Sequence, residues 1–373
     1  MNTRPGVRAG RPAAGPEGDD RRYGEDGGTR TRATLRDVAR LAGVHPATAS
    51  RALNEATRSL VTATTVQRVV AAAAELAYRP NPIARGLRTS RSFTIGVVIP
   101  DLTNPLFPPI VRGIEDTLNR SGYGTLAMNT DNDPARERTA IETLRAREVD
   151  GFIAATARRD DTALEELIES GIPVALVNRR MPDRRLPVAA VDDRDGVRQA
   201  VTHLAELGHE RIAHIGVSRA LSTGHERYEG FIEAMRAMGL EPDPDLIVLA
   251  DAFTEPEGAR ICGALLDAGR DMTAIVAAND LIALGCYDAM DDRGVACPAE
   301  LSVVGFNDMP FVARFRPPMT TIRIPHYQMG VAAAELLLER IDSPDAPPRE
   351  VLLEPALVVR GSTAAPSVDV SVR

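Results

Sequence analysis

From residue 93 onward, short apolar runs alternate with stretches in which apolar residues recur at helical spacing. The apolar runs are residues 93–100, 125–129, 151–156, 173–178, 211–216, 246–250, 274–279 and 302–306. The helical stretches between them include residues 110–118, 135–147, 197–207, 227–238 and 281–290. Continuous apolar strands are typical of a parallel sheet with helices on both faces. About nine such units exceed one ordinary sheet, so the pattern predicts two doubly wound α/β lobes with a ligand cleft at the carboxyl ends of the strands.

Residues 34–78 carry a different pattern, which predicts three short helices. Thr34 and Asp37 have the spacing of a capping box, and an apolar face follows them. A glycine turn comes next, and Pro46 suits the first position of a second helix. The third helix is expected over about residues 62–77. Two short helices joined through a glycine turn predict a helix-turn-helix DNA-binding unit.

The remaining segments complete the predicted domain organisation. Residues 1–33 have almost no large apolar side chains, so they are expected to be a disordered extension. Residues 79–92 are rich in proline and arginine and are interpreted as a hinge. The body is expected over residues 93–363, followed by a tail at 364–373. Within the body, the first lobe is assigned to about 93–190 and 320–345, and the second to about 191–319 and 346–363.

Composition and charge narrow the class of protein. With 44% hydrophobic and 26% charged residues, the chain suits a soluble globular fold. It has no apolar run near the ~20 residues of a membrane span and no signal-peptide pattern, so no membrane partner is expected. Three cysteines without metal-ligand spacing favour a reducing, cytoplasmic location. The net charge is −8, yet residues 34–90 hold eight arginines and three acidic residues, which indicates local contact with nucleic acid.

The sequence argues against an enzyme. It contains no lysine, which excludes a P-loop lysine and a Schiff-base lysine. His209 and His214 are five residues apart, so they do not have the HExxH spacing of a zinc site. There is also no GxSxG element and no glycine-rich phosphate loop. We therefore expect neither catalysis nor a metal or cofactor.

Several motifs occur in a characteristic order along the chain. They are DVARLAGV at 37–44, ATASRALN at 47–54, ELAYRPNPIARGLRT at 75–89, IGVVIPDLTNPLF at 95–107, HLAELGHERIAHIG at 203–216, RYEGF at 227–231, AANDLIALG at 277–285, SVVGFND at 302–308 and PPMTTIRIP at 317–325. In this order they resemble the lactose-repressor (LacI/GalR) family of bacterial regulators. The resemblance implies an all-α helix-turn-helix headpiece followed by a periplasmic-binding-protein-like body of two lobes. It also implies a repressor that binds a palindromic operator as a homodimer under the allosteric control of a small molecule.

The DNA-binding residues are expected in the second helix and in the hinge. Arg51 can donate two hydrogen bonds to guanine O6 and N7 in the major groove. The resemblance implies further contacts to base edges or phosphates from this helix and the residues flanking it, namely His45, Pro46, Ala47, Thr48, Ser50 and Asn54. For Thr48 and Ser50, capping and packing remain an alternative role. In the hinge, the resemblance implicates Ala84 and Leu87, with Leu87 as an apolar wedge that kinks the duplex from the minor groove.

The resemblance also implies a set of effector-binding residues, which are Asp101, Phe107, Thr223, Arg227, Phe253, Asn279 and Asn307. Phe107 and Phe253 match aromatic faces against a ligand ring, although core packing is an alternative for both. Arg227 resembles an arginine that forks onto ligand hydroxyls or carboxylates. Asn307 stands where the family commonly has Asp, and Asp101 could instead cap a turn. A sugar or sugar derivative is the first expectation for the ligand, and a purine-type corepressor is the second.

Two further expectations concern assembly and the competing class of protein. Leu284 matches a position in the family's dimer interface. The alternative function is a solute-binding protein of a transport system, since the body alone resembles periplasmic sugar binders. That alternative predicts a secretion signal and no basic helix-turn-helix, and the sequence shows the opposite.

Overall fold

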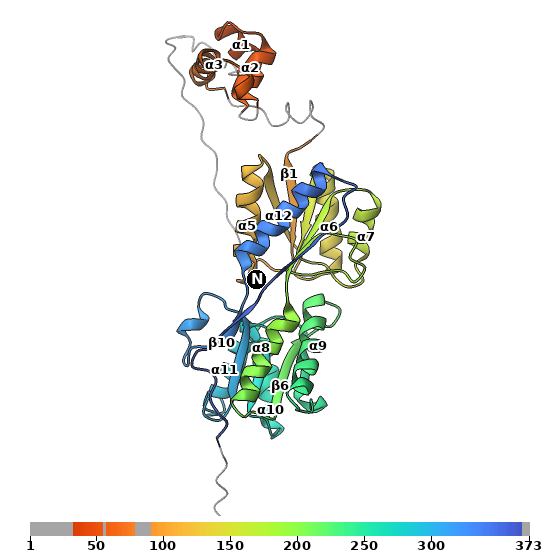
Figure 1. The fold of residues 1–373 in the computed structure, drawn as a ribbon, viewed down its shortest axis with the longest axis vertical. Helices are drawn as coiled ribbons and strands as arrows, with labels where there is room; N and C mark the ends of the chain where they lie inside the picture. Colours follow the sequence, from red (N-terminus) through yellow and green to blue (C-terminus); the bar gives the residue numbers. More distant parts are fainter. Residues whose placement is uncertain (1–32, 55–56, 79–90, 368–373) are drawn as a thin grey trace, which may run out of the picture. The chain divides into compact units, whose positions relative to one another are not determined.

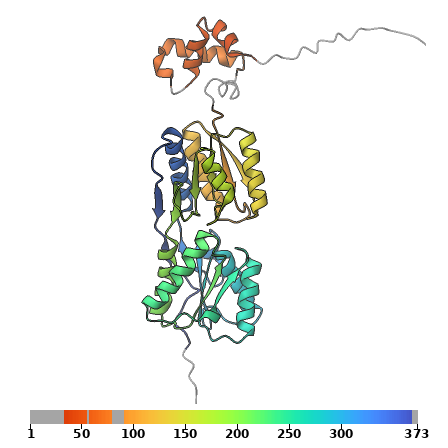
Figure 2. The same ribbon diagram turned by 90° about the vertical axis from the view of Figure 1, so that its right-hand side faces the viewer.

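The computed structural model describes residues 33–54, 57–78 and 91–367 (Figures 1 and 2). These residues belong to two compact units, within Met1–Asn81 and Pro82–Arg373, and we describe each unit by itself. Most of the predicted N-terminal extension and of the predicted hinge lies outside the described residues. Within the described ranges, no helix combines the length and the apolar character that a membrane span requires.

The first unit is a small three-helix domain. It contains α1 (Leu35–Leu41), α2 (Pro46–Leu53), the 3-10 turn η1 (Arg58–Leu60) and α3 (Ala63–Glu75). The helices pack around a core that includes Val38, Ala49 and Val69. The capping box of Thr34 and Asp37 forms as predicted, with each residue accepting the other's backbone N–H. The small side chains of this core allow the short helices to pack closely. The face of α2 opposite this core is exposed.

The first lobe of the body is a parallel six-stranded sheet in the order β11-β5-β4-β3-β1-β2. Its strands are β1 (Thr94–Ile99), β2 (Gly124–Asn129), β3 (Gly151–Ala154), β4 (Val174–Val177), β5 (Val188–Val191) and β11 (Glu350–Leu353). Its helices are α5 (Phe107–Arg120), α6 (Pro134–Ala146), α7 (Thr162–Glu169) and α12 (His326–Asp342). The helices α5 and α12 cover one face, and α6 and α7 pack on the other (Figure 1).

The second lobe repeats this architecture with the order β12-β10-β9-β8-β6-β7. Its strands are β6 (Ile212–Val217), β7 (Ile247–Ala250), β8 (Ala274–Ala277), β9 (Ser302–Asn307), β10 (Thr320–Arg323) and β12 (Ala356–Val358). Its α-helices are α8 (Asp193–Glu206), α9 (Ser222–Ala237), α10 (Glu255–Asp267) and α11 (Asp280–Asp291), and its 3-10 turns are η2 (Pro244–Leu246) and η3 (Val312–Arg314). All strand pairs are parallel except β10 with β12. The prediction of two doubly wound α/β lobes is confirmed.

The lobe boundaries near the C-terminus differ from those expected. Of residues 320–345, which were assigned to the first lobe, α12 packs there as expected, but β10 pairs with β9 in the second. Residues 346–363 were assigned to the second lobe, but β11 pairs with β5 in the first. The chain therefore crosses between the lobes after β5, after β10 and again between β11 and β12. Short edge strands of three or four residues carry too few positions for a periodic pattern to reveal which sheet they join.

The predicted tail also begins later than expected, because residues 362–364 are bound to the second lobe. Ser362 is fully buried, and its backbone carbonyl accepts the N–H of Val303 at 2.9 Å. The carbonyl of Ala364 lies 2.8 Å from His209 Nε2, and its N–H donates to Ser302 Oγ at 3.2 Å. These bonds extend the second lobe past residue 363.

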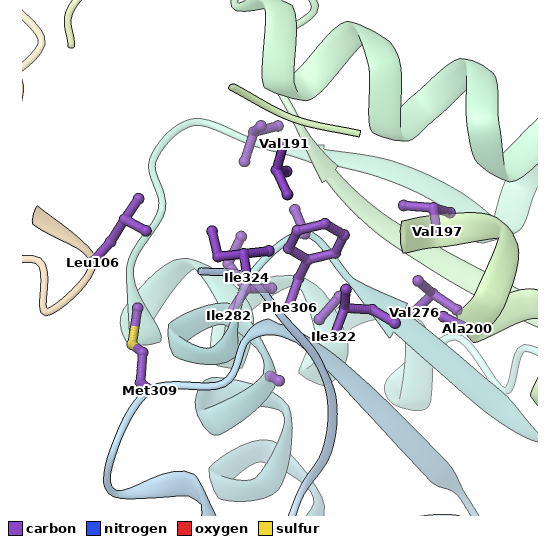
Figure 3. Packing of buried hydrophobic residues seen from close by; sticks show 14 of the residues in the cluster. Leu106, Val191, Val197, Ala200, Val276, Ile282, Phe306, Met309, Ile322 and Ile324 are labelled. Carbon is purple, nitrogen blue, oxygen red and sulfur yellow. The ribbon is translucent and has the colours of Figure 1, made fainter. Parts of the chain in front are cut away.

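A continuous apolar cluster runs through both lobes, and Figure 3 shows part of it. Phe306 lies at its centre, fully buried among side chains that include Ile322 and Val197. Gly196 on α8 makes room for this ring, because a Cβ there would lie 2.8 Å from two of its atoms. Leu106 of the first lobe and Met309 of the second belong to the same cluster. Apolar side chains of both lobes are therefore close-packed where the lobes meet. This packing restricts the positions of the neighbouring polar residues.

Candidate functional site

The exposed face of α2 carries the DNA-binding residues predicted in the headpiece. Ala49 and Ala52 are buried in the core, so the residues between and before them face outward. Arg51 and Ala47 are exposed. Pro46, Thr48, Ser50 and Asn54 are half-buried, with Pro46 in the first turn as expected and Asn54 at the C-cap. A small-residue inner face and an arginine on the outer face suit a helix that lies against a DNA groove.

His45 caps α2, because its Nδ1 accepts the backbone N–H of Ala47 at 3.2 Å. Its expected contact with DNA remains a prediction. The imidazole is exposed, which leaves Nε2 for another partner. The predicted hinge contacts, Ala84 and Leu87, lie outside the described residues.

The body contains a cavity of about 320 Å³ lined by residues of both lobes. All seven predicted effector residues line it, which are Asp101, Phe107, Thr223, Arg227, Phe253, Asn279 and Asn307. The remaining lining residues were not predicted from the sequence; they are Pro100, Thr103, Asn104, Leu106, Asp131, Asn132, Asn178, Arg179, Ala252 and Thr254. Most of these residues follow β1, β2, β4 or β7. Their position after an apolar run could have identified them, because ligands bind at the carboxyl ends of such strands.

Arg227 on α9 forms a buried ion pair on the second-lobe side of this cavity. Its Nε donates to Asp193 Oδ1 at 2.8 Å, and the two residues are 3% and 2% exposed. Its Nη1 donates to the carbonyl of Ala278, and its guanidinium lies 3.8 Å from the centre of the Phe306 ring. Burial raises the pKa of Asp193, while the charge of Arg227 opposes that rise. Since the protein uses Nε and Nη1, Nη2 is the group that Arg227 can offer to a ligand.

Three buried polar atoms around the cavity have no hydrogen-bond partner among the described residues: Thr223 Oγ1, Asn307 Oδ1 and Arg179 Nε. Leaving such a group unpaired costs about 1–3 kcal/mol, so native proteins rarely do so without a reason. Asn307 also has a φ of 117°, a conformation that strongly favours glycine. Strained and unpaired groups that converge on one cavity indicate a site at which a ligand completes the hydrogen bonding.

Other predicted effector residues already have partners within the protein. Asp101 Oδ1 accepts Thr103 N–H at 2.8 Å and Thr103 Oγ1 at 2.7 Å, which is the turn-capping role given as its alternative. Asn279 Oδ1 caps α11 by accepting Ile282 N–H at 2.8 Å. Phe107 is only 3% exposed and belongs to the core cluster, as its alternative role suggested. These three residues shape the cavity wall more than they offer free polar groups.

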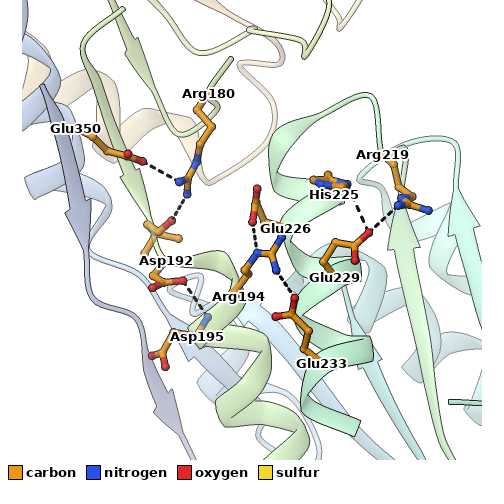
Figure 4. A network of polar contacts seen from close by, with 11 residues as sticks. Arg180, Asp192, Arg194, Asp195, Arg219, His225, Glu226, Glu229, Glu233 and Glu350 are labelled. Carbon is orange, nitrogen blue, oxygen red and sulfur yellow. Dashed lines mark hydrogen bonds and ion pairs between the residues drawn. The ribbon is translucent and has the colours of Figure 1, made fainter. Parts of the chain in front are cut away.

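Polar contacts join the two lobes beside the cavity. The backbone N–H of Arg180 donates to Ser222 Oγ at 2.9 Å, and that of Arg159 donates to the carbonyl of Ala220 at 2.9 Å. Next to them, Arg194 on α8 forms ion pairs with Glu226 and Glu233 on α9 (Figure 4). The two backbone contacts hold the start of α9, which carries Thr223, against the first lobe. The ion pairs of Arg194 join α8 to α9 within the second lobe.

Leu284, the predicted dimer residue, is half-buried on α11. Its role in an interface remains a prediction. Among the described residues there is no cluster of three or more His, Cys, Asp or Glu side chains that could hold a metal ion.

Comparison with known families gives matches to both units. The description "Bacterial regulatory proteins, lacI family" matches residues 34–81, and "Periplasmic binding protein-like domain" matches residues 201–363. The HTH-type transcriptional regulator RegA of Clostridium saccharobutylicum is 35% identical over 331 residues, covering 88% of this chain and 99% of RegA.

Solved structures give matches of similar extent. The lac repressor dimer bound to operator and the anti-inducer ONPF is 28% identical with a TM-score of 0.78, covering 90% of this chain and 100% of that one. A complex of the transcriptional regulator CelR with cellobiose is 32% identical with a TM-score of 0.69, covering 89% of this chain and 100% of that one.

These matches agree with the three-helix unit and the two-lobed body, and they confirm the predicted resemblance and the predicted regulatory function. A solute-binding protein of a transport system does not fit, because the matches extend across the helix-turn-helix unit. The relatives are transcriptional regulators rather than enzymes. The chain belongs to the lacI family of bacterial regulatory proteins and is a DNA-binding transcriptional regulator.

Proposed function

We propose that this regulator is a cytoplasmic repressor that binds a palindromic operator as a homodimer. In this proposal, a sugar or sugar derivative in the cavity between the lobes changes its affinity for DNA. The family membership and the operator-bound lac repressor dimer support the DNA-binding part. One α2 helix reads one half-site, so a palindrome requires two copies of the chain.

The observation that carries the effector proposal is the set of unpaired polar atoms in the cavity. Thr223 Oγ1 can donate or accept, Asn307 Oδ1 can accept, and Arg179 Nε can donate. A sugar hydroxyl both donates and accepts, so adjacent hydroxyls would satisfy all three atoms. The similar regulator CelR has been solved in complex with cellobiose, which is consistent with this ligand class.

A purine-type corepressor is the second candidate. It would need a flat aromatic surface against which to stack. Phe253 is partly buried and lines the cavity, so it could provide one. Phe107 is almost fully buried, which leaves little of its ring for a second face. The aromatic lining therefore favours a sugar over a purine.

A thermal-shift screen of the full chain against neutral sugars, polyols, sugar acids, sugar phosphates and purines tests the effector proposal. A ligand that binds the folded protein raises its melting temperature by mass action. Stabilisation by at least one sugar or sugar derivative is expected. Stabilisation by purines alone would move the assignment to the second candidate, and silence across the whole panel would contradict the sugar proposal.

A further inference from the structure

Arg179 is a buried arginine in the cavity that forms no ion pair with the described part of the chain. It follows β4 and is 3% exposed. Its Nη1 donates to the carbonyl of Thr156 at 3.1 Å, and its Nη2 donates to Asn132 Oδ1 at 2.9 Å. Both partners are neutral, and its Nε is buried without a partner among the described residues. A buried charge is normally paired, so this guanidinium requires an explanation.

Two acidic side chains, Glu137 and Asp161, attract this charge, but neither forms an ion pair with it. Glu137 is buried and accepts a hydrogen bond from Thr156 Oγ1, and burial raises the pKa of its carboxyl. Asp161 accepts the N–H groups of Leu164 and Arg158, each at 3.1 Å. Burial lowers the pKa of Arg179 to about 10, so its guanidinium is still charged at neutral pH. The first-lobe wall of the cavity thus presents a positive charge and a free N–H.

The second-lobe wall presents another guanidinium, that of Arg227, whose charge also lowers the pKa of Arg179. Arg227 forms a buried ion pair with Asp193, whereas Arg179 forms no ion pair with any residue that the structure describes. Among the described lining residues, the carboxylates are Asp101 and Asp131. Asp101 caps a turn, and Asp131 is exposed and paired with Arg136. The buried lining contains amides instead, and so lacks a carboxylate to balance Arg179.

We infer that the ligand of this cavity carries an anionic group, a carboxylate or a phosphate, on a hydroxyl-rich skeleton, and that Arg179 Nε donates to that group. This inference rests on the proposed effector site and narrows its ligand to sugar acids and sugar phosphates. An anion that accepts from Arg179 and from Arg227 Nη2 relieves the repulsion between the two guanidiniums and is bound by both lobes at once. The hydroxyls then satisfy Asn307 and Thr223.

Matched sets of ligands test this inference on the unmodified full chain. The sets are glucose with glucuronate and glucose 6-phosphate, galactose with galacturonate and galactose 6-phosphate, and ribose with ribose 5-phosphate. Titration calorimetry should find at least one anionic member that binds roughly tenfold or more tightly than its neutral parent, since hydrogen bonds to charged groups are the stronger ones. Comparing the sugar acids with the sugar phosphates shows whether the site binds a carboxylate or a phosphate.

Other results would overturn the inference. Equal or tighter binding of the neutral parents would overturn it while keeping the proposed effector site. Absence of binding by every anionic member would also overturn it. If the neutral sugars do not bind either, the proposed sugar effector is contradicted as well. The failure of the inference is therefore distinguishable from the failure of the proposed function.

Variants identify the residue responsible. Arg179→Gln should lower affinity for the anionic sugar roughly tenfold or more and lower affinity for its neutral parent much less, because a hydrogen bond to a charged group is the stronger one. The matched control is Arg180→Gln, the adjacent arginine, which is paired with Glu350 and does not line the cavity. Retention of the full anionic preference in Arg179→Gln would contradict the assignment. The wild-type comparison requires no variant, so the inference stays testable if Arg179→Gln does not fold.

Discussion

At the scale of single residues, the cavity holds polar groups whose hydrogen bonds are incomplete within the protein. The family resemblance implied Thr223, Arg227 and Asn307 as effector residues, and all three line the cavity. Arg179 was not predicted to line the cavity, because most arginines lie on the surface and the sequence does not show that this one is buried. Charge in a sequence does not reveal whether a side chain is paired.

The unpaired hydroxyl of Thr223 leads to a variant that separates binding from stability. Thr223→Val keeps the side-chain shape and breaks no hydrogen bond within the described protein, so the free energy of unfolding should hold or rise. Effector affinity should fall by about 1–3 kcal/mol, measured by calorimetry. Thr321→Val is the control, since Thr321 Oγ1 donates to buried Asp280 at 2.6 Å, and its loss should destabilise the fold. A normal effector affinity in Thr223→Val would place the ligand elsewhere.

Asp280, at the start of α11, gives the body a specific pH dependence. Burial raises its pKa from 3.8 to about 7, although Thr321 Oγ1 and Met309 N–H donate to its carboxyl. Folding therefore favours the protonated form, so this contribution to stability is fully present below about pH 4 and is lost as pH rises through about 7. Asp280→Asn mimics the protonated acid and should abolish that dependence.

The measurement is urea unfolding of both proteins across this range. The stability of the wild type relative to Asp280→Asn should fall by about 4 kcal/mol between pH 4 and pH 8. A difference that stays constant with pH would show that Asp280 is ionised throughout.

At the scale of elements, the apolar runs predicted eight strands, and each of them is a strand of one of the two sheets. The strands β5, β10, β11 and β12 were not predicted, because short segments carry little periodicity. The helices α7, α10 and α12 were also absent from the sequence interpretation. Which lobe a segment joins depends on long-range pairing, and that information is not local to the segment.

Close helix pairs in the body depend on glycine. On α12, a Cβ at Gly330 would overlap the carbonyl oxygen of Ile110 on α5. Gly330→Ala should therefore destabilise the body by about 1–3 kcal/mol or more, as overpacking does, although alanine alone favours a helix by about 1 kcal/mol. The free energy of unfolding in urea measures this, and stabilisation by the substitution would contradict the packing of α5 on α12.

The recognition helix α2 gives a prediction for DNA. Arg51→Ala should weaken operator binding by about 1–3 kcal/mol and relax specificity at a guanine, while effector binding stays intact. Arg112→Ala removes an exposed arginine from the body and should leave operator affinity unchanged. Anisotropy titrations with labelled operator and scrambled DNA measure both, and an unchanged operator affinity in Arg51→Ala would show that α2 is not the reading helix.

At the scale of the whole molecule, the body consists of two lobes connected by three crossings, with the ligand cavity between them. A ligand can shift a conformational equilibrium only if it binds one arrangement of the lobes more tightly than another. A cavity whose unpaired groups come from both lobes meets that condition, because a bound molecule joins the lobes in one particular arrangement. The proposed regulation follows from this geometry together with the DNA-binding headpiece.

The most direct test is the operator affinity of the full chain, measured by anisotropy on its upstream DNA with and without a saturating ligand from the screen. We expect the operator Kd to change roughly fivefold or more in the wild type, the coupling typical of allosteric proteins. In Thr223→Val the same change should require a ligand concentration roughly 5- to 150-fold higher, in line with the expected loss of about 1–3 kcal/mol in effector affinity. An operator Kd that stays the same while calorimetry shows the cavity to be occupied would contradict the claim that this cavity controls DNA binding.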